Sequence, residues 1–147
     1  MPEGQCIFCS IVEGKIPTAI IHEDDVGLAF LDITPATKGH TVLISKEHYE
    51  DIFSVPSEKL ERLIVFAKGL MEHIKEKLST QGFNLESFIG PASGSMVKHF
   101  ALHLIPRYED DGQERPFAQR MKFGSKEELT KYLEETAEKI TEHTAVA

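Results

Sequence analysis

The sequence has no tryptophan, only two cysteines and no apolar run long enough to cross a membrane. A secreted disulfide scaffold carries more cysteines, and a secretory signal needs a basic segment followed by an apolar one, which the first residues lack. We therefore expect a cytoplasmic protein without a membrane partner. Its content of 41% hydrophobic and 27% charged residues is typical of a globular chain that buries a core.

A concentrated basic surface is also missing. The formal net charge is −8, and lysine and arginine are scattered among acidic residues rather than gathered in a stripe. A general nucleic-acid binder needs such a stripe to displace counterions from phosphates, so we predict no nucleic-acid partner. The 147 residues contain neither a repeat nor an interdomain linker. This length suits one domain, which we expect to span residues 1–147.

Two hydrophobic periods divide the chain into strands and helices. Segments rich in β-branched and aromatic residues predict strands at 19–22, 27–32, 40–45, 84–89 and 98–105. Pro106 is expected to end the last strand because it cannot donate to a ladder. Apolar residues at three- and four-residue steps from Leu60 to Leu78 predict a long amphipathic helix, with Ser57 as its N-cap.

A final helix is expected from Ser125, whose spacing from Glu128 is that of a capping box. Its apolar stripe is predicted to pack on the core: Leu129, Tyr132, Leu133, Ala137 and Ile140. The order of strands, long helix, strands and helix predicts an α+β fold. We expect a five-stranded antiparallel sheet with a long helix and a C-terminal helix.

The most informative segment has the sequence VKHFALHLIPR over residues 97–107. Alternate side chains of a strand share a face, so His99, Ala101 and His103 are predicted to lie on one side. Their apolar neighbours are predicted to face the core: Phe100, Leu102 and Leu104. A glycine-containing loop at 90–95 precedes this strand, and its backbone N–H groups can cradle a phosphate.

This segment resembles the signature of the histidine-triad family, in which three histidines alternate with apolar residues and Pro-Arg often follows. The resemblance covers roughly residues 6–108 and includes CIFC at 6–9, FLDI at 30–33, KGHT at 38–41 and KEH at 46–48. The combination is specific, although each piece alone is weak. Sliding the pattern by two residues would make His99 or His103 central, but would break the match to Pro106-Arg107 and to the glycine loop.

In that family the central histidine attacks the α-phosphorus of a nucleotide substrate and forms a covalent intermediate that water releases. Ala101 stands at this position here and has no nucleophile. The family pattern also has asparagine and glutamine where this chain has Phe88 and Ser95. One missing histidine is what deliberate inactivation would produce, whereas three changes point to a naturally altered site. A mixture of the two stays open.

The resemblance implies a partial nucleotide site. His103 aligns with the third histidine and would contact the phosphate or act as an acid or base. Asp32 aligns with the aspartate that binds the ribose hydroxyls. The remaining nucleotide-binding residues implied are Ile7, Phe8, Ile11, Phe30 and Ile33 around the base, and Gly94, Ser95, Met96 and Val97 beside the phosphate.

The two cysteines, Cys6 and Cys9, fit either a metal site or a redox pair. A redox pair is expected at a strand-to-helix turn, whereas these residues precede all predicted strands. The resemblance to prokaryotic family members implies a structural Zn²⁺ held by Cys6, Cys9, His48 and His99. His99 would then be a structural ligand, and His103 would remain free in the nucleotide site.

These observations predict a histidine-triad-type nucleotide-binding protein. By ancestry it would be a hydrolase or transferase of nucleoside phosphoramidates or dinucleoside polyphosphates at the α-phosphate, impaired by Ala101. The alternative is a non-catalytic module that binds a nucleoside monophosphate, a related nucleotidyl compound or a protein. A third hypothesis is a structural domain whose site has lost its function, and the retained His103 argues against it. The resemblance also implies a homodimer, and the role of residues 109–147 stays open.

Overall fold

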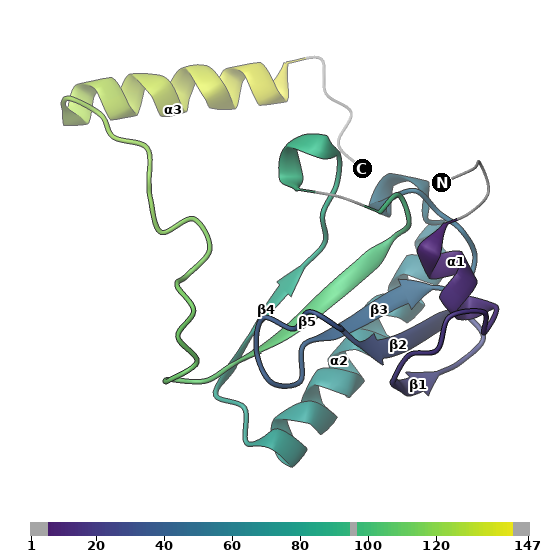
Figure 1. Cartoon of the computed structure of the whole chain (residues 1–147). Helices are drawn as coiled ribbons and strands as arrows, with labels where there is room; N and C mark the ends of the chain where they lie inside the picture. Colours follow the sequence, from purple (N-terminus) through teal and green to yellow (C-terminus); the bar gives the residue numbers. More distant parts are fainter. Residues whose placement is uncertain (1–5, 95–96, 143–147) are drawn as a thin grey trace. The chain divides into compact units, whose positions relative to one another are not determined.

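The computed structural model describes residues 6–94 and 97–142 (Figure 1). The chain divides into two compact units, the first ending at Gln113 and the second beginning at Glu114. A single domain over residues 1–147 therefore stays a prediction. Within the described residues, no helix combines the length and the hydrophobicity that a membrane crossing requires.

The first unit is built on a five-stranded antiparallel sheet in the order β1-β2-β3-β5-β4, which confirms the predicted α+β fold. The strands are β1 (Ile20–Glu23), β2 (Gly27–Leu31), β3 (Thr41–Ser45), β4 (Gly82–Glu86) and β5 (Ala101–Arg107). The helices are α1 (Ile7–Val12), α2 (Ser57–Leu78) and α3 (Lys126–Thr141), with 3₁₀ turns η1 (Ile52–Ser54) and η2 (Pro91–Ser93).

The central strands of the sheet are buried on both faces. Helix α2 crosses one face, where Leu43, Leu102 and Leu104 pack against the helix residues Leu63 and Ala67. The opposite face carries a second apolar cluster. Its buried members are Ile11, Leu28, Phe30, Val42 and Ile44. Because neighbouring side chains alternate between the faces, one strand serves the helix-covered core and the site opposite at once.

Strand β5 follows the predicted alternation. Leu102, Leu104 and Pro106 are buried, whereas Ala101 and His103 are partly exposed. The predicted end before Pro106 is wrong, because β5 continues to Arg107 and Pro106 pairs with β4. Pairing with β3 reaches only as far as Leu104, so no β3 partner on that side needs the N–H that proline lacks.

The start of β5 also differs from the prediction, because His99 lies before the strand rather than in it. The predicted N-cap of α2 needs correction as well. Helix α2 begins at Ser57 itself, and Pro56 is the N-cap, since its carbonyl accepts the first helical bond from Leu60 N–H. For α3 the predicted cap is confirmed, because Ser125 Oγ accepts from Glu128 N–H at 3.1 Å.

Helix α3 belongs to the second unit. It contains no buried residue, and the predicted packing of its apolar stripe on the core stays a prediction. Leu133 and Ile140 are 55% and 65% exposed. The Glu128 side chain accepts from Gly124 N–H at 2.9 Å, which supports the first turn in the manner of a capping box displaced by one residue.

Candidate functional site

Two clusters of titratable side chains lie on the face of the sheet opposite α2. Four groups form the first: Cys6, Cys9, His48 and His99. Cys6 is the N-cap of α1, and its Sγ accepts from Cys9 N–H at 3.5 Å. The first turn of α1 therefore brings the two thiols of the Cys-x-x-Cys motif together, as zinc-binding motifs of this spacing require.

The ligand atoms of this cluster surround a common centre. Cys6 Sγ lies 3.2 Å from His99 Nδ1, Cys9 Sγ lies 3.3 Å from His48 Nδ1, and the two Nδ1 atoms are 3.2 Å apart. With Zn–S bonds of about 2.3 Å and Zn–N bonds of about 2.0 Å, tetrahedral ligands are separated by roughly 3.3–3.8 Å. The spacing therefore fits one tetrahedral metal ion.

His99 is oriented for this role by the backbone of β3. Its Nε2 donates to the carbonyl oxygen of Ser45 at 2.7 Å, which leaves the lone pair of Nδ1 facing the cysteines. Burial lowers the pKa of His99, so the ring is in the neutral form that binds metal. Burial and the neighbouring Cys6 raise the pKa of Cys9 to about 11, and a cation would offset that cost to the thiolate.

The second cluster consists of Asp32, His40 and His103. Asp32 follows β2, His40 precedes β3, and His103 lies in β5. His40 Nε2 lies 3.0 Å from His103 Nδ1 and 3.5 Å from Asp32 Oδ2. Burial lowers the pKa of both histidines, which favours their neutral forms.

A cavity of about 410 Å³ lies between these two clusters, and its wall includes His99, Ala101, His103 and Asp32. One end is apolar. Phe8 packs edge-on against Phe30 at 5.9 Å between centroids and against His99 at 5.7 Å. Every described residue predicted for nucleotide binding lines this cavity: Ile7, Phe8, Ile11, Phe30, Asp32, Ile33, Gly94, Val97 and His103. Ser95 and Met96, also predicted, lie outside the described residues.

Position 101 lies in the wall of this cavity. Ala101 pairs with Ile44 of β3, and its cavity neighbour His103 pairs with Val42. The predicted common side of His99, Ala101 and His103 holds, since all three line the cavity although His99 precedes the strand. A methyl group therefore stands where a larger side chain on β5 would project toward a ligand.

Two residues at the site were not among the predicted binding residues. Phe88 lines the cavity and packs edge-on against His103 at 5.2 Å between centroids. His40 lies within hydrogen-bond distance of His103, but the sequence alone gave no chemical role for His40. Its place in the KGHT segment, which resembles the family, was the one feature of the sequence that pointed to the site. The departure from asparagine at position 88 likewise marked Phe88 as part of the site.

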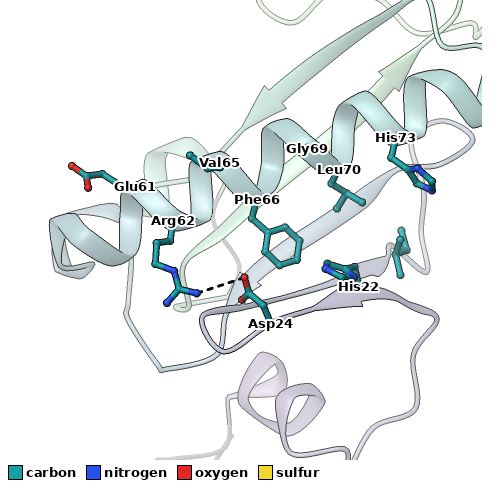
Figure 2. A pocket seen from close by; sticks show the side chains of 10 residues that line it. His22, Asp24, Glu61, Arg62, Val65, Phe66, Gly69, Leu70 and His73 are labelled. Carbon is teal, nitrogen blue, oxygen red and sulfur yellow. Dashed lines mark ion pairs between the residues drawn. The ribbon is translucent and has the colours of Figure 1, made fainter.

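A larger groove, of about 710 Å³, lies between β1 and α2 and shares no lining residue with the cavity beside His103. Figure 2 shows Phe66 above His22, with a distance of 5.4 Å between ring centroids, and Arg62 beside Asp24 at 3.8 Å. Arg62 also pairs with Asp25 at 2.5 Å. Because the cationic group of this groove is already paired, size alone does not make it the better candidate for an anionic ligand.

This fold, with its histidine clusters on one face of the sheet, is that of the histidine-triad class of proteins. The HIT domain family profile matches residues 13–110, which is more than half of the chain. The chain belongs to the HIT family. Its Cys/His cluster fits the zinc-binding type of that family, and the central triad position is Ala101.

Curated relatives agree with this assignment. The chain is 44% identical to a HIT-like protein of Methanocaldococcus jannaschii, over 74% of this chain and 83% of that protein. It is 31% identical to an adenosine 5′-monophosphoramidase of Schizosaccharomyces pombe, over 72% of this chain and 77% of that protein. It is also 31% identical to an adenylylsulfatase of Arabidopsis thaliana, over 74% of this chain but 55% of that longer protein.

Solved structures of the family have the same fold. A HIT family protein from Bacillus anthracis superposes with a TM-score of 0.79 at 36% identity, over 97% of this chain and 99% of that one. A zinc-bound histidine-triad protein from Mycobacterium smegmatis superposes with a TM-score of 0.70 at 30% identity, over 92% and 95% of the two chains.

Proposed function

We propose that this protein binds a nucleoside monophosphate or a related nucleotidyl compound in the cavity between the two clusters, without forming a covalent intermediate at position 101. The observation that carries the proposal is the mixed lining of the cavity. Aromatic and aliphatic side chains, among them Phe8 and Phe30, line one end, and the polar residues Asp32 and His103 line the wall as well. This is the distribution that a base, a ribose and a phosphate require.

The apolar and the polar lining residues have different tasks in the proposal. The base packs between apolar side chains of α1 and β2, where its burial supplies most of the affinity. The Asp32 carboxylate accepts hydrogen bonds from the ribose hydroxyls through Oδ2, since Oδ1 already accepts from Thr34 N–H at 2.9 Å. His103 and the backbone near Gly94 contact the phosphate.

The absence of a nucleophile at position 101 favours binding over the ancestral nucleotidyl-transfer reaction. Nucleotidyl transfer through the enzyme needs a lone pair to attack the α-phosphorus, and the Ala101 methyl group has none. The competing hypothesis is direct hydrolysis, in which water attacks the phosphorus and His103 serves as acid or base. The activities named for two relatives, on a phosphoramidate and on an adenylyl sulfate, make compounds with AMP linked to a leaving group the substrates to test.

We further propose that the first cluster holds one structural Zn²⁺. The choice of zinc is supported by two thiols and two imidazoles at tetrahedral spacing, a ligand set that zinc prefers, and by the zinc-bound relative. The bound ion would keep both thiolates ionised and fix α1 beside the sheet. Because α1 supplies Phe8 and Ile11 to the cavity, the metal would also shape the base-binding end.

A homodimer is proposed from the resemblance, and helix α2 offers an apolar surface for it. Ile64 and Val65 are 44% and 66% exposed on this helix. Sedimentation of the intact chain should give twice the monomer mass of 16.5 kDa, and Val65→Asp should shift it toward the monomer. A monomeric unmodified chain at micromolar concentration would refute the dimer.

The expected cytoplasmic location remains a prediction.

The nucleotide proposal is tested by calorimetry with AMP and by AMP release from adenosine 5′-phosphoramidate. We expect AMP to bind, Asp32→Ala to weaken binding about tenfold, and Asp51→Ala, a carboxylate that does not line the cavity, to leave it unchanged. The unmodified chain should release no AMP, whereas Ala101→His should. Release by the unmodified chain would favour direct hydrolysis, and no binding of AMP would overturn the proposal.

A further inference from the structure

The loop that carries Asp32 has little apolar packing of its own. It connects β2 to β3, residues 33–36 in it are exposed, and the side chain of Ile33 is 86% exposed. Thr37 is buried, and its Oγ1 donates to the carbonyl oxygen of Pro106 at 2.6 Å. Because few apolar contacts fix this loop, hydrogen bonds from other segments determine where it lies.

A turn after β5 supplies two of these hydrogen bonds. The Tyr108 hydroxyl donates to the carbonyl oxygen of Lys38 at 2.9 Å. The side-chain amide of Gln113 donates to the carbonyl oxygen of Ala36, also at 2.9 Å. The partners are 70 and 77 positions apart in the chain. The middle of the loop is therefore held from outside, by the 108–113 turn.

The Asp111 carboxylate gives this turn its shape. It accepts from the backbone N–H groups of Tyr108 and Gln113 at 2.9 Å each, and from Arg107 Nε at 2.8 Å. Arg107 Nη1 also donates to Asn84 Oδ1 in β4 at 2.7 Å. The Arg107 guanidinium holds the pKa of Asp111 well below its usual range, so the carboxylate stays ionised and its hydrogen bonds are charge-assisted. The turn is thus anchored to both β4 and β5.

The position of the loop decides how the Asp32 carboxylate is oriented. The N–H and the Oγ1 of Thr34 donate to Asp32 Oδ1 at 2.9 and 3.1 Å. Thr34 is two residues from Ala36, the point at which Gln113 holds the loop. A shift of Ala36 therefore moves Thr34, and with it the carboxylate that lines the cavity.

We propose that Tyr108 and Gln113 are positioning residues for the ribose: by holding the backbone of residues 36–38, they keep the Asp32 carboxylate directed at the two ribose hydroxyls of a bound nucleotide. This inference rests on the proposed function for the identity of the ligand. Neither residue is among the described residues that line the cavity, so both act through Asp32. Their effect on affinity should depend on the ribose hydroxyls and should vanish when Asp32 is replaced.

The first test compares AMP with 2′,3′-dideoxyadenosine 5′-monophosphate, which lacks both hydroxyls, by calorimetry. The unmodified chain should bind AMP about tenfold more tightly than the dideoxy nucleotide. Gln113→Ala should weaken AMP binding about fivefold and leave binding of the dideoxy nucleotide unchanged. Tyr108→Phe, which loses only the hydroxyl, should act in the same direction.

Gln81→Ala is the matched control for Gln113→Ala. Gln81 Oε1 accepts from Glu109 N–H at 2.8 Å, so this side-chain amide contacts the same turn without reaching the loop. We expect Gln81→Ala to leave the affinities for both nucleotides unchanged. Equal losses for the two nucleotides in Gln113→Ala would overturn the inference, as would equal affinity of the unmodified chain for both.

The second test repeats Gln113→Ala on the Asp32→Ala background. If Gln113 acts through Asp32, the second substitution should not weaken AMP binding further. A similar loss in both backgrounds would show that Gln113 supports the fold in general, and would refute the positioning role.

The third test needs no ligand, which separates the inference from the function on which it rests. Hydrogen exchange of the Thr34 N–H, followed by NMR in the intact chain, should be about fivefold faster in Gln113→Ala and unchanged in Gln81→Ala. Unchanged exchange in Gln113→Ala would overturn the positioning role even if AMP binds. If exchange is faster but the unmodified chain does not bind AMP, the proposed function fails and the ribose contact fails with it, whereas the restraint of the loop by Gln113 is supported.

Discussion

His99 Nε2 donates to the carbonyl oxygen of Ser45 at 2.7 Å, and this bond determines which nitrogen of His99 faces the two cysteines. Ser45 ends β3, and its own hydroxyl donates to the carbonyl of Glu47 at 2.8 Å. The sheet thus orients one member of the Cys/His cluster, while the N-cap and the first turn of α1 supply Cys6 and Cys9. The site therefore joins the N-terminal helix to the central strands.

Removing a metal ligand should destabilise the fold through loss of zinc. We expect about one zinc per chain by elemental analysis, and His48→Ala should reduce it. A hundredfold weaker affinity lowers the free energy of unfolding by about 2.7 kcal/mol at concentrations where the original site is saturated. His22→Ala is the matched control, since His22 is exposed and packs on Phe66 outside the cluster. Equal zinc content in both variants would contradict the assignment.

Acid should destabilise the protein through its buried histidines. Burial lowers the pKa values of His40 and His103 below the ordinary histidine value of about 6.5, so the unfolded chain binds more protons as the pH falls below that value. Stability from these groups is complete above about pH 6.5 and is lost as the pH falls through the folded-state pKa values. Each histidine contributes a slope of at most about 1.4 kcal/mol per pH unit.

Urea unfolding between pH 5.5 and 8 measures this effect. The unmodified chain should lose stability only on the acid side of this range. His40→Asn removes one of the two groups, so its stability should fall less steeply than that of the unmodified chain. A steeper acid loss in the variant would show that the sign is wrong.

The turn before β3 should tolerate no side chain at Gly39. Its φ of +88° favours glycine, and an added Cβ would lie 2.6 Å from Leu78 Cδ1 at the end of α2. Gly14 is a matched control, because it has a φ of +78° but nothing within 4 Å of an added Cβ. We expect Gly39→Ala to cost about 2–4 kcal/mol and Gly14→Ala about 1–2 kcal/mol by urea unfolding. If Gly39→Ala and Gly14→Ala lower the free energy of unfolding equally, the Leu78 side chain moves away from the added Cβ without an energetic cost.

Patterns within one segment were the most predictable part of the fold. The alternation of β5 correctly separated Leu102 and Leu104 from Ala101 and His103, because a strand has only two faces. The three- and four-residue period likewise predicted α2. The end of β5 was not predictable in this way, since Pro106 is tolerated only because β3 stops pairing at Leu104.

Contacts between segments far apart in the chain were harder to predict from the sequence. The metal cluster joins residues up to 93 positions apart, and it was predicted from family resemblance rather than from spacing. The His40–His103 contact spans 63 positions, and neither residue's local pattern indicates it. For α3 the sequence leaves the packing partner open, because an apolar stripe specifies that a helix can pack but not what it packs against.

Phe88 should limit any activity that a histidine at position 101 restores. The Phe88 ring lines the same cavity as Ala101 and lies against His103, where the family pattern has a polar residue. On the Ala101→His background, Phe88→Asn should raise AMP release from adenosine 5′-phosphoramidate about tenfold, because the amide adds one hydrogen bond near the phosphate. Phe88→Leu is the control that removes the ring without adding an amide. If Phe88→Asn and Phe88→Leu raise the rate of AMP release equally, the cause is the removal of the crowded aromatic ring. The missing polar contact at position 88 would then play no part in the loss of the ancestral reaction.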